Sequence, residues 1–345
     1  MDEKEKKEKN VEVAGLAPYV KLVIRQLKED KKHPAVHTYN ATLNSFTEFW
    51  ASIGTKMPES GNQEMPEKGD GMEQMPMNEI FTAGKLKEYE NWLRSRKASW
   101  NTVSTYMRTL RAVYNRLVSP GSVDYNAHLF DDVYTKVMSQ TKRALTREQM
   151  NTLLYADFES LPKEVQCALA YFLLMFMFRG MPFIDLAYLR KQDVKGNTIV
   201  YCRHKTGKQI TVRIHKEAET LFEKYRSTNP DSVYLFPILD SKLEKEGELY
   251  QCYLDALGRF NKKLAKVATL LLPGAKISSY TARHTWATLA FYLGIPVGAI
   301  CEALGHSSIR VTEAYLKPFS NEKVDSENDK LIDSVMNGRE KMKAA

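Results

Sequence analysis

Apolar residues recur with the period of an α-helix over most of the first third of the chain. Residues 16–27 form one such stretch, and the stretch that follows carries its stripe on Tyr39, Leu43, Phe46 and Trp50. A third helix is predicted from about Glu79 to Arg96. A fourth begins at Ser99 or Asn101, either of which can act as its cap, and buries Val103, Met107, Leu110, Tyr114 and Leu117. These four helices predict a helical domain over residues 13–120.

Breaks in this pattern divide the chain. Residues 1–12 have mixed charge and low hydrophobicity, which predicts a disordered tail, and residues 54–76 are rich in Gly, Pro, Glu and Met, which predicts a loop. A second break at 119–126 places a domain boundary between 120 and 145, with a linker over 121–144. Thr146, followed by Glu148 and Gln149, then predicts a new helix start. The second domain is expected over 145–320, and residues 321–345 form a C-terminal tail.

One segment of the second domain has the pattern of strands. Residues 199–203 and 209–214 alternate in the manner of two short strands, and HKTGK joins them, with Gly207 available for a positive φ. The expected fold class is therefore mainly α with a small β-hairpin (α+β), in two domains.

Composition narrows the class of protein. The chain has 345 residues, of which 43% are hydrophobic and 27% charged, as in ordinary globular proteins. Its longest apolar run, residues 167–178, is too short to cross a bilayer, and no apolar stretch follows the charged start as a signal peptide would. The four cysteines lie far apart without zinc-site spacing, which favours reduced, buried residues in a cytoplasmic protein. No Gly-rich phosphate loop supports nucleotide hydrolysis.

The distribution of charge is more informative than the net value of +8. Residues 91–123, 194–216 and 256–301 contain no acidic residue, and each stretch contains six Lys or Arg. Concentrated positive charge on an otherwise acidic chain is expected of a surface that follows a phosphate backbone, although such stretches also arise by chance. For any single arginine a solvated helix face is the alternative. The candidate DNA contacts are Arg108, Arg111, Lys208, Arg259, Lys262 and Lys263.

Chemically distinctive residues gather in the second half. The hairpin tip carries Lys205 within KTGK, SYTARHTWATLAFYLG carries Arg283 and His284, and LGHSSIRVTEAY places His306 nine residues before Tyr315. In this order the residues closely resemble the catalytic domain of tyrosine recombinases, the phage integrases, over roughly 145–319. Residues 16–118 resemble the core-binding domain of that family. The resemblance implies that the two domains close as a clamp around duplex DNA.

The resemblance also implies a reaction. Tyr315 would attack phosphorus to give a 3′-phosphotyrosine and a free 5′-hydroxyl, which a new 5′-hydroxyl can reverse. Arg283 would stabilise the non-bridging oxygens without losing its proton, and His306 would hydrogen-bond the phosphate or assist proton movement. Lys205 would protonate the leaving oxygen. Neither ATP nor a metal nor any other cofactor is expected.

The sequence departs from the family pattern at two positions. Tyr280 stands where the family has the first His of its His-x-x-Arg box, and a phenol can still donate a hydrogen bond to phosphate. Pro182 stands where the first catalytic arginine belongs, and Arg179 is the substitute that the sequence offers; similar displaced arginines occur in a branch of conjugative-transposon integrases and DNA invertases. Asp185 matches the family's acidic residue that orients this arginine, and His284 is expected to orient Arg283 or Tyr315.

The resemblance predicts the partners. We expect double-stranded DNA with a specific core site and a homotetramer on paired sites, with a monomer or dimer when free, no membrane, and a place in the cytoplasm or on the nucleoid. The short apolar stripe of Leu331, Ile332, Val335 and Met336 is either a helix that docks on a neighbouring protomer or part of a disordered end.

The leading interpretation is an integrase or invertase, and the sequence does not say which DNA site or reaction direction it uses. Pro182 keeps open a DNA-binding regulator or excision factor with a degenerate site. A nicking enzyme like the type IB topoisomerases is a third possibility.

Overall fold

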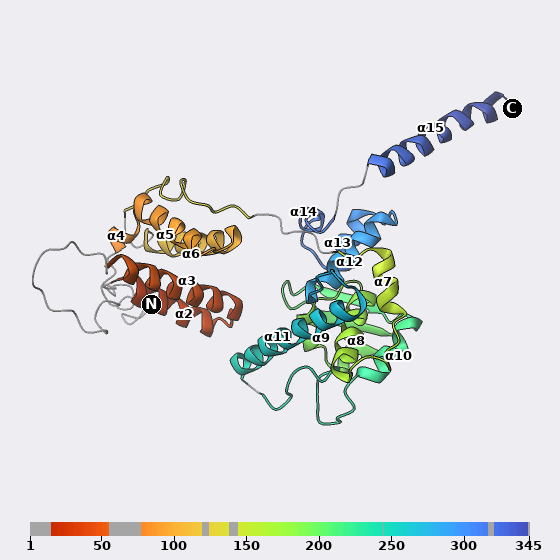
Figure 1. Cartoon of the computed structure of the whole chain (residues 1–345), viewed down its shortest axis with the longest axis horizontal. Coiled ribbons are helices and arrows are strands. Elements are labelled where there is room, and N and C mark those ends of the chain that lie inside the picture. The colour runs from red at the N-terminus through yellow and green to blue at the C-terminus, as the bar shows by residue number, and fades with distance from the viewer. Residues whose placement is uncertain are drawn as a thin grey trace, which may run out of the picture. The chain divides into compact units, whose positions relative to one another are not determined.

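The computed structural model describes residues 15–54, 77–118, 124–137, 144–243, 245–316 and 321–343. The chain divides into two compact units, Met1–Ser139 and Gln140–Ala345 (Figure 1). The division falls inside the range predicted for the linker. The tail over 1–12 and the loop over 55–76 lie outside the described residues.

The first unit is a bundle of helices. In chain order these are α2 (Leu16–Glu29), α3 (His33–Gly54), α4 (Met77–Ile80), α5 (Ala83–Ser95) and α6 (Trp100–Val118). The central helix α3 packs against α2, α5 and α6. Tyr89 of α5 is fully buried against it, with its ring centre 4.9 Å from that of Phe46 and 5.2 Å from that of Phe49.

Two local signals decide where these helices begin. The helix predicted over 79–96 is split, because the Thr82 side chain accepts a hydrogen bond from the backbone N–H of Lys85 and caps α5 separately from α4. Ser99, rather than Asn101, caps α6, since its hydroxyl accepts from the N–H of Thr102 at 3.1 Å.

The chain after α6 remains part of the first unit. Residues 124–137 contain no helix or strand, yet Leu129, Phe130 and Val133 are buried in the core of the α2–α6 bundle. The Tyr114 phenol also donates to the carbonyl of Asp124 at 2.8 Å. The stretch predicted as a linker therefore includes residues that belong to the core of the first unit.

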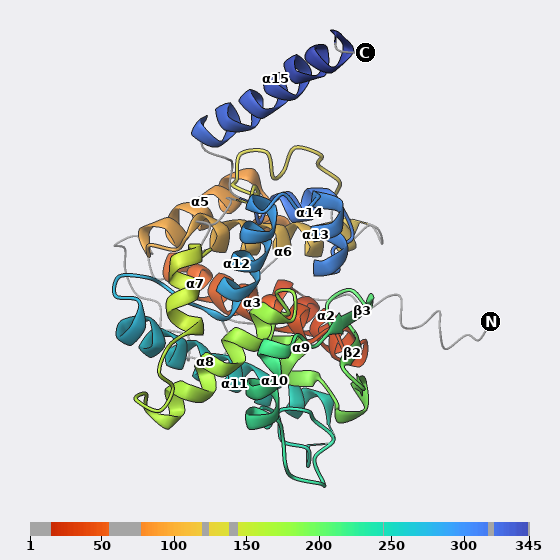
Figure 2. The same ribbon diagram turned by 90° about the vertical axis from the view of Figure 1, so that its right-hand side faces the viewer.

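The second unit surrounds the apolar helix α8. Its helices are α7 (Arg147–Leu154), α8 (Lys163–Met177), α9 (Phe183–Tyr188), the short 3₁₀ helix η2 (Lys191–Asp193), α10 (Lys216–Tyr225), α11 (Glu246–Leu271), α12 (Ser279–Tyr292), α13 (Val297–Leu304), α14 (Ile309–Glu313) and α15 (Asn321–Lys343). Helices α7, α10, α11 and α12 all contact α8 (Figure 2). This explains why α8 is apolar on nearly every side.

The second unit also contains a small antiparallel sheet in the order β1 (Val194–Lys195), β2 (Thr198–Cys202) and β3 (Gln209–Arg213). The register pairs Thr198 with Arg213 and Cys202 with Gln209. Gly207 has φ +66° in the connection, as the sequence predicted. Strand β1 was not predicted, because two residues are too few to show an alternating pattern.

The mainly α fold with a small antiparallel sheet is thus confirmed. One detail of the sequence interpretation is wrong: of the four free cysteines only Cys301 is buried, and Cys202 at the end of β2 is exposed. No helix in the described ranges is both long and apolar enough to span a bilayer.

Candidate active site

Arg283 lies near the start of α12 and is almost completely enclosed, with 2% of its surface exposed. Its Nη1 donates to the carbonyl of Gly180 at 2.9 Å, and its Nη2 donates to the carbonyl of Leu304. Nη2 also lies 2.9 Å from Nε2 of His306. The guanidinium therefore joins the turn after α8 to the end of α13, and these bonds fix its position before any substrate arrives.

The glycines at both of these turns are required by close packing. Gly305 ends α13 with φ +63°, and a Cβ there would lie 2.7 Å from Cδ1 of Ile210 on β3. Gly180 has φ +68°, and a Cβ there would lie 3.1 Å from Cα of Arg283. Glycine tolerates both the left-handed backbone and the contact. The glycines of the RG and LGH motifs thus allow the backbone carbonyls of Gly180 and Leu304 to approach the Arg283 guanidinium.

His306 follows Gly305 and is held on both sides of its ring. Nδ1 lies 2.9 Å from the hydroxyl of Thr312, a fully buried residue of α14. Because a guanidinium can only donate, Nε2 must be the unprotonated acceptor from Arg283, and Nδ1 then carries the proton and donates to Thr312. His306 is neutral with its proton on Nδ1.

The electrostatic surroundings agree with this assignment. Burial, followed by the charges of Arg283, Arg203 and Lys205, lowers the pKa of His306 from 6.5 to about 3. Lys205, in the exposed β2–β3 connection, is therefore close enough to influence the imidazole. The hairpin brings a flexible cation to the edge of the buried cluster.

Tyr315 follows α14 and is half-buried beside these groups. Its ring centre lies 5.1 Å from the ring of His306 and 4.6 Å from the ring of His284, and 5.8 Å from the Arg283 guanidinium carbon. The Tyr315 carbonyl accepts a hydrogen bond from Thr288 of α12 at 3.3 Å. Of the residues that the sequence singled out, Arg283, His306, Tyr315 and His284 are thus brought together.

Asp185 of α9 is buried and faces the hairpin. Its Oδ1 accepts from the backbone N–H of His204 at 2.9 Å, and its Oδ2 lies 3.6 Å from Nε of Arg203. Burial raises the pKa of the Asp185 carboxyl, although the His204 N–H and the guanidinium groups of Arg203 and Arg283 oppose this. Asp185 therefore supports the hairpin rather than Arg179.

The Arg179 side chain bonds to β3, whereas the sequence suggested that it would replace the missing catalytic arginine at Pro182. It has φ +58°, a left-handed conformation that is costly for a residue with a side chain. Its Nη1 donates to the carbonyl of Thr211 on β3 at 3.2 Å, and it lines an open groove together with Lys208 and Glu302. Pro182 is the N-cap residue of α9, and its side chain supplies no donor.

Tyr280 lies in the first turn of α12 with 57% of its surface exposed. Partial desolvation and the neighbouring Tyr315 raise its pKa further above neutrality, and the protonated phenol can donate a hydrogen bond. Its exposure leaves it accessible from outside the buried cluster.

The candidate DNA contacts differ in accessibility. Arg108 and Arg111 of α6 and Arg259 and Lys262 of α11 are exposed, whereas Lys208 and Lys263 are half-buried. Nζ of Lys208 pairs with Glu302 at 2.7 Å, so its charge is partly neutralised in the free protein. The first four are better placed for contact with a backbone.

Sequence reasoning missed two buried members of this site, Thr312 and Arg203. Arg203 follows β2 on the inward register that Ile199 and Tyr201 share, and this period-2 alternation would have indicated an inward arginine. Thr312 gave no such signal, because a threonine in a short helix is ordinary. Within the residues described, no group of three His, Cys, Asp or Glu side chains is placed to hold a metal ion.

Comparison with known proteins gives a consistent result. The profile of the phage integrase family matches residues 143–322, and that of the phage integrase SAM-like domain matches residues 16–132. Tyrosine recombinase XerA of Thermococcus kodakarensis is 26% identical over 204 residues, which cover 58% of this chain and 67% of that protein. The protein of the same name from Pyrococcus furiosus is 26% identical over 208 residues, covering 59% and 67%.

Solved structures share the fold at low identity. The Tn1549 transposon integrase in complex with a circular intermediate DNA superposes with a TM-score of 0.60 at 16% identity, covering 90% of this chain and 99% of that one. The lambda integrase dimer bound to a core site gives a TM-score of 0.54 at 16% identity, covering 87% and 76%. Since the family profile spans more than half of the chain and the site residues lie within it, this protein belongs to the phage integrase family of tyrosine recombinases.

Proposed function

We propose that this recombinase cuts and rejoins DNA at specific sites with Tyr315 as its nucleophile. The observation that carries the proposal is the gathering of Arg283 from α12, His306 from the turn after α13 and Tyr315 from the residues after α14 around one small region. A phenol beside a fixed guanidinium and a neutral imidazole is suited to attack on a phosphodiester.

The side chains of Tyr315, His306 and Lys205 account for every bond and proton of the cleavage step. The Tyr315 oxygen forms a bond to phosphorus as the bond from phosphorus to the 5′-oxygen breaks. Nε2 of His306 takes the phenol proton as Nη2 of Arg283 transfers its hydrogen bond from that nitrogen to the phosphate, and Lys205 supplies a proton to the leaving 5′-oxygen. Since the phosphotyrosine keeps the energy of the broken bond, a different 5′-hydroxyl can attack it, with the proton transfers reversed, and restore the DNA strand.

The remaining residues position these groups or extend their contacts. Arg283 stabilises the negative charge on the non-bridging oxygens, and Tyr280 donates a hydrogen bond from the exposed side. His284 orients Tyr315 by packing against its ring, and Asp185 holds the start of the β2–β3 connection that carries Lys205. The low pKa of His306 makes it a weak base in the DNA-free protein, and the phosphate charge would offset the nearby arginines.

Covalent capture tests the nucleophile and does not require a defined DNA site. A library of nicked duplexes with randomised cores is incubated with the protein, denatured, and searched for protein–DNA adducts. We expect adducts that retain a nucleotide on the peptide containing Tyr315, and their loss in Tyr315→Phe.

Tyr155→Phe is the matched control, because Tyr155 lies in the same unit, is 86% exposed and takes part in none of the site contacts described above. It should trap adducts at the unaltered rate. Adducts that persist in Tyr315→Phe would overturn the assignment of the nucleophile. Sequence-specific binding without any adduct would favour the regulator with a degenerate site.

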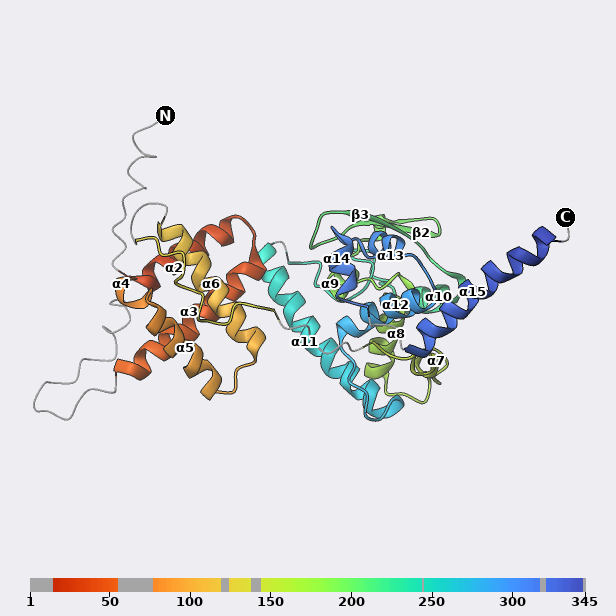
Figure 3. The ribbon, with the colours of Figure 1, turned by 90° about the horizontal axis from the view of Figure 1, so that it is seen from above.

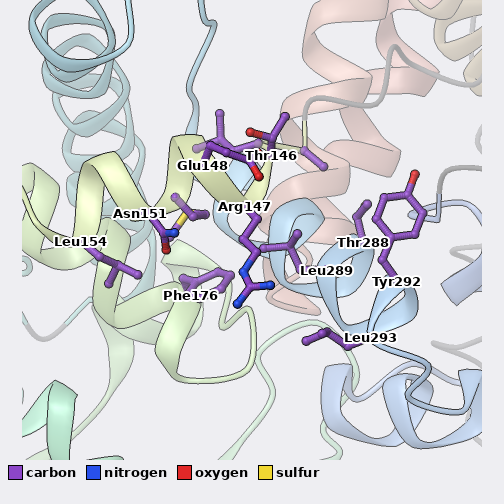
Figure 4. Close-up of a pocket in the computed structure, with 13 residues that line it drawn as sticks. Thr146, Arg147, Glu148, Asn151, Leu154, Phe176, Thr288, Leu289, Tyr292 and Leu293 are labelled. Atoms are coloured by element: carbon purple, nitrogen blue, oxygen red, sulfur yellow. The ribbon is translucent and has the colours of Figure 1, made fainter.

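We further propose that the active assembly is a homotetramer on paired double-stranded sites, joined through α15. The described side chains of this helix leave Val324, Leu331, Ile332, Val335 and Met336 exposed on one stripe. A pocket of about 730 Å³ lies between α7 and α12, with Leu154, Phe176, Leu289 and Leu293 among its lining residues (Figure 4). An apolar stripe and an apolar pocket on the same chain are complementary between two copies.

A further inference from the structure

We propose that Arg203 takes the place of the missing first arginine and binds a non-bridging oxygen of the scissile phosphate beside Arg283. This inference rests on the proposed recombinase function. It differs from the sequence expectation, which assigned the role to Arg179.

The guanidinium groups of Arg203 and Arg283 donate hydrogen bonds to adjacent backbone carbonyls of the turn that ends α13. Nη1 of Arg203 donates to the carbonyl of Gly305 at 3.0 Å, and Nη2 of Arg283 donates to the carbonyl of Leu304. The next residue in the chain is His306, which Arg283 also contacts. The Arg203 guanidinium is therefore held at Gly305, the residue directly before His306, whose ring lies beside Tyr315. Figure 3 shows β2 and β3 on the same side of the second unit as α13 and α14.

The cluster carries more positive than negative charge. Arg203 is 7% exposed and Arg283 is 2% exposed, so both cations are largely withdrawn from water. Asp185 is the carboxylate that faces Arg203, and its separation of 3.6 Å from Nε of Arg203 is too long for a hydrogen bond. Nε of Arg203 and Nε of Arg283 are enclosed without a hydrogen-bond partner. Buried cations of this kind are costly unless an anion completes the site.

Among the described residues that line the small cavity beside Pro182, the one cation is Arg283 itself. The other residues that line this cavity of about 40 Å³ are uncharged: Pro182, Phe183, Ile184, Tyr253, Leu257, Ser279 and Tyr280. The Phe183 ring stacks on Phe260 with centres 4.2 Å apart, which fills the surrounding space with apolar groups. The second guanidinium of the cluster therefore comes from the hairpin and not from α9.

Arg179 is less suited to the role. Its described hydrogen bond joins it to the Thr211 carbonyl, and the groove that it lines includes the ion pair of Lys208 with Glu302. Arg203, by contrast, influences both Arg283 and His306, since its charge contributes to lowering the pKa of each group. Contacts and charge therefore both favour Arg203.

The test compares two substrates that differ in one charge. Duplexes recovered by covalent capture are made with either a phosphate or a neutral methylphosphonate at the cleaved position, and single-turnover adduct formation is measured. We expect Arg203→Ala to slow cleavage of the phosphate by about 10²–10³-fold, the usual effect of removing one donor to a developing oxyanion. The loss on methylphosphonate should be less than about tenfold, because the neutral group needs less positive charge.

Arg179→Ala is the matched control and should change neither rate by more than about threefold. Arg203→Met, which keeps the length of the side chain, guards against misfolding and should reproduce the selective loss. A phosphate rate in Arg203→Ala within about threefold of the unaltered protein overturns the proposal. Equal losses on the two substrates also overturn it, since they would indicate a structural role.

A second measurement tests anion binding by Arg203 without requiring any DNA cleavage. Binding of inorganic pyrophosphate is followed by calorimetry for the unaltered chain and for both arginine variants. Loss of binding in Arg203→Ala, with binding retained in Arg179→Ala, supports the anion site even if no adduct ever forms. Unchanged pyrophosphate binding in Arg203→Ala counts against it.

Discussion

At the scale of single residues, the site depends on donors whose direction is already fixed. Arg283 has its two Nη atoms committed to backbone carbonyls, so its position does not depend on bound DNA. His306 is locked in one tautomer between Arg283 and Thr312. Preorganised donors of this kind need little rearrangement as charge develops on a phosphate.

The protonation state of His306 gives a testable dependence of stability on pH. Its pKa is lowered from 6.5 to about 3 in the folded chain, so that the unfolded chain binds a proton that the folded chain rejects between these values. The free energy of unfolding should therefore fall as pH drops below 6.5, by up to about 1.4 kcal/mol for each pH unit from this group. This contribution should be fully present above pH 6.5.

Urea unfolding between pH 4 and pH 8 measures this effect, with His306→Gln as the comparison. The variant should be less stable at neutral pH but should lose less stability on acidification than the unaltered chain. If the free energy of unfolding changed with pH equally in the two proteins, the neutral, buried state of the His306 imidazole would be contradicted. A flat chemical shift of the His306 ring from pH 5 to pH 8 should accompany the result.

At the scale of elements, short turns bring the site together more than the long helices do. Gly180 follows α8, Gly305 follows α13 and Gly207 lies in the β2–β3 connection, each with positive φ. The helices supply rigid frames, including α12 with Arg283, and these turns hold its guanidinium and place His306 and Lys205 beside it. Helix α15 differs, because its apolar stripe is exposed in the single chain.

The proposed docking of α15 predicts a loss of assembly when its stripe is made polar. Leu331→Glu should prevent tetramer formation on paired captured duplexes, because a carboxylate on the stripe would have to be buried in the pocket of the neighbouring copy. Light scattering after size exclusion measures the mass of the complex. Leu293→Glu at the rim of the pocket should have the same effect.

Ser326→Glu is the control, since this position lies on the opposite side of α15 from Leu331 and adds the same charge. It should leave the mass of the complex unchanged. A tetramer that survives both Leu331→Glu and Leu293→Glu would remove the pocket as the docking site.

At the scale of the whole molecule, two separate cores each present exposed basic helices. The first unit presents Arg108 and Arg111 on α6, and the second presents Arg259 and Lys262 on α11. A chain that contacts the DNA backbone with both units neutralises several phosphates at once. Binding of this kind depends steeply on salt, because bound counterions are released.

The logarithm of the association constant for a random-sequence duplex should therefore fall linearly with the logarithm of the salt concentration, with a slope of about −0.9 for each phosphate neutralised. Replacing Arg108 and Arg111 together by Ala should reduce the magnitude of the slope by about 1 to 2, as fluorescence anisotropy can measure. Arg226→Ala is the control, since Arg226 is paired with Glu223 at 2.8 Å. A slope near zero for the unaltered chain would exclude contact with the backbone by both units.

The sequence by itself determined much of the local structure. Helical periodicity and capping residues such as Thr146 predicted elements that the structure contains, because these signals act over a few residues. The hairpin and the positive φ of Gly207 were predicted for the same reason. The order of Lys205, Arg283, His306 and Tyr315 was enough to indicate the family, since chemistry demands these residue types whatever the backbone does.

Only the tertiary structure decided which side chains meet. Arg283 bonds to Gly180, which lies 103 residues away along the chain, and Arg203 bonds to Gly305 across 102 residues. Arg179 looked closest to Pro182 in sequence, yet its left-handed backbone directs it toward β3, while Arg203 enters from the hairpin. Local patterns fix the conformation of a segment, but the direction of a long side chain depends on the packing of segments that are distant in sequence.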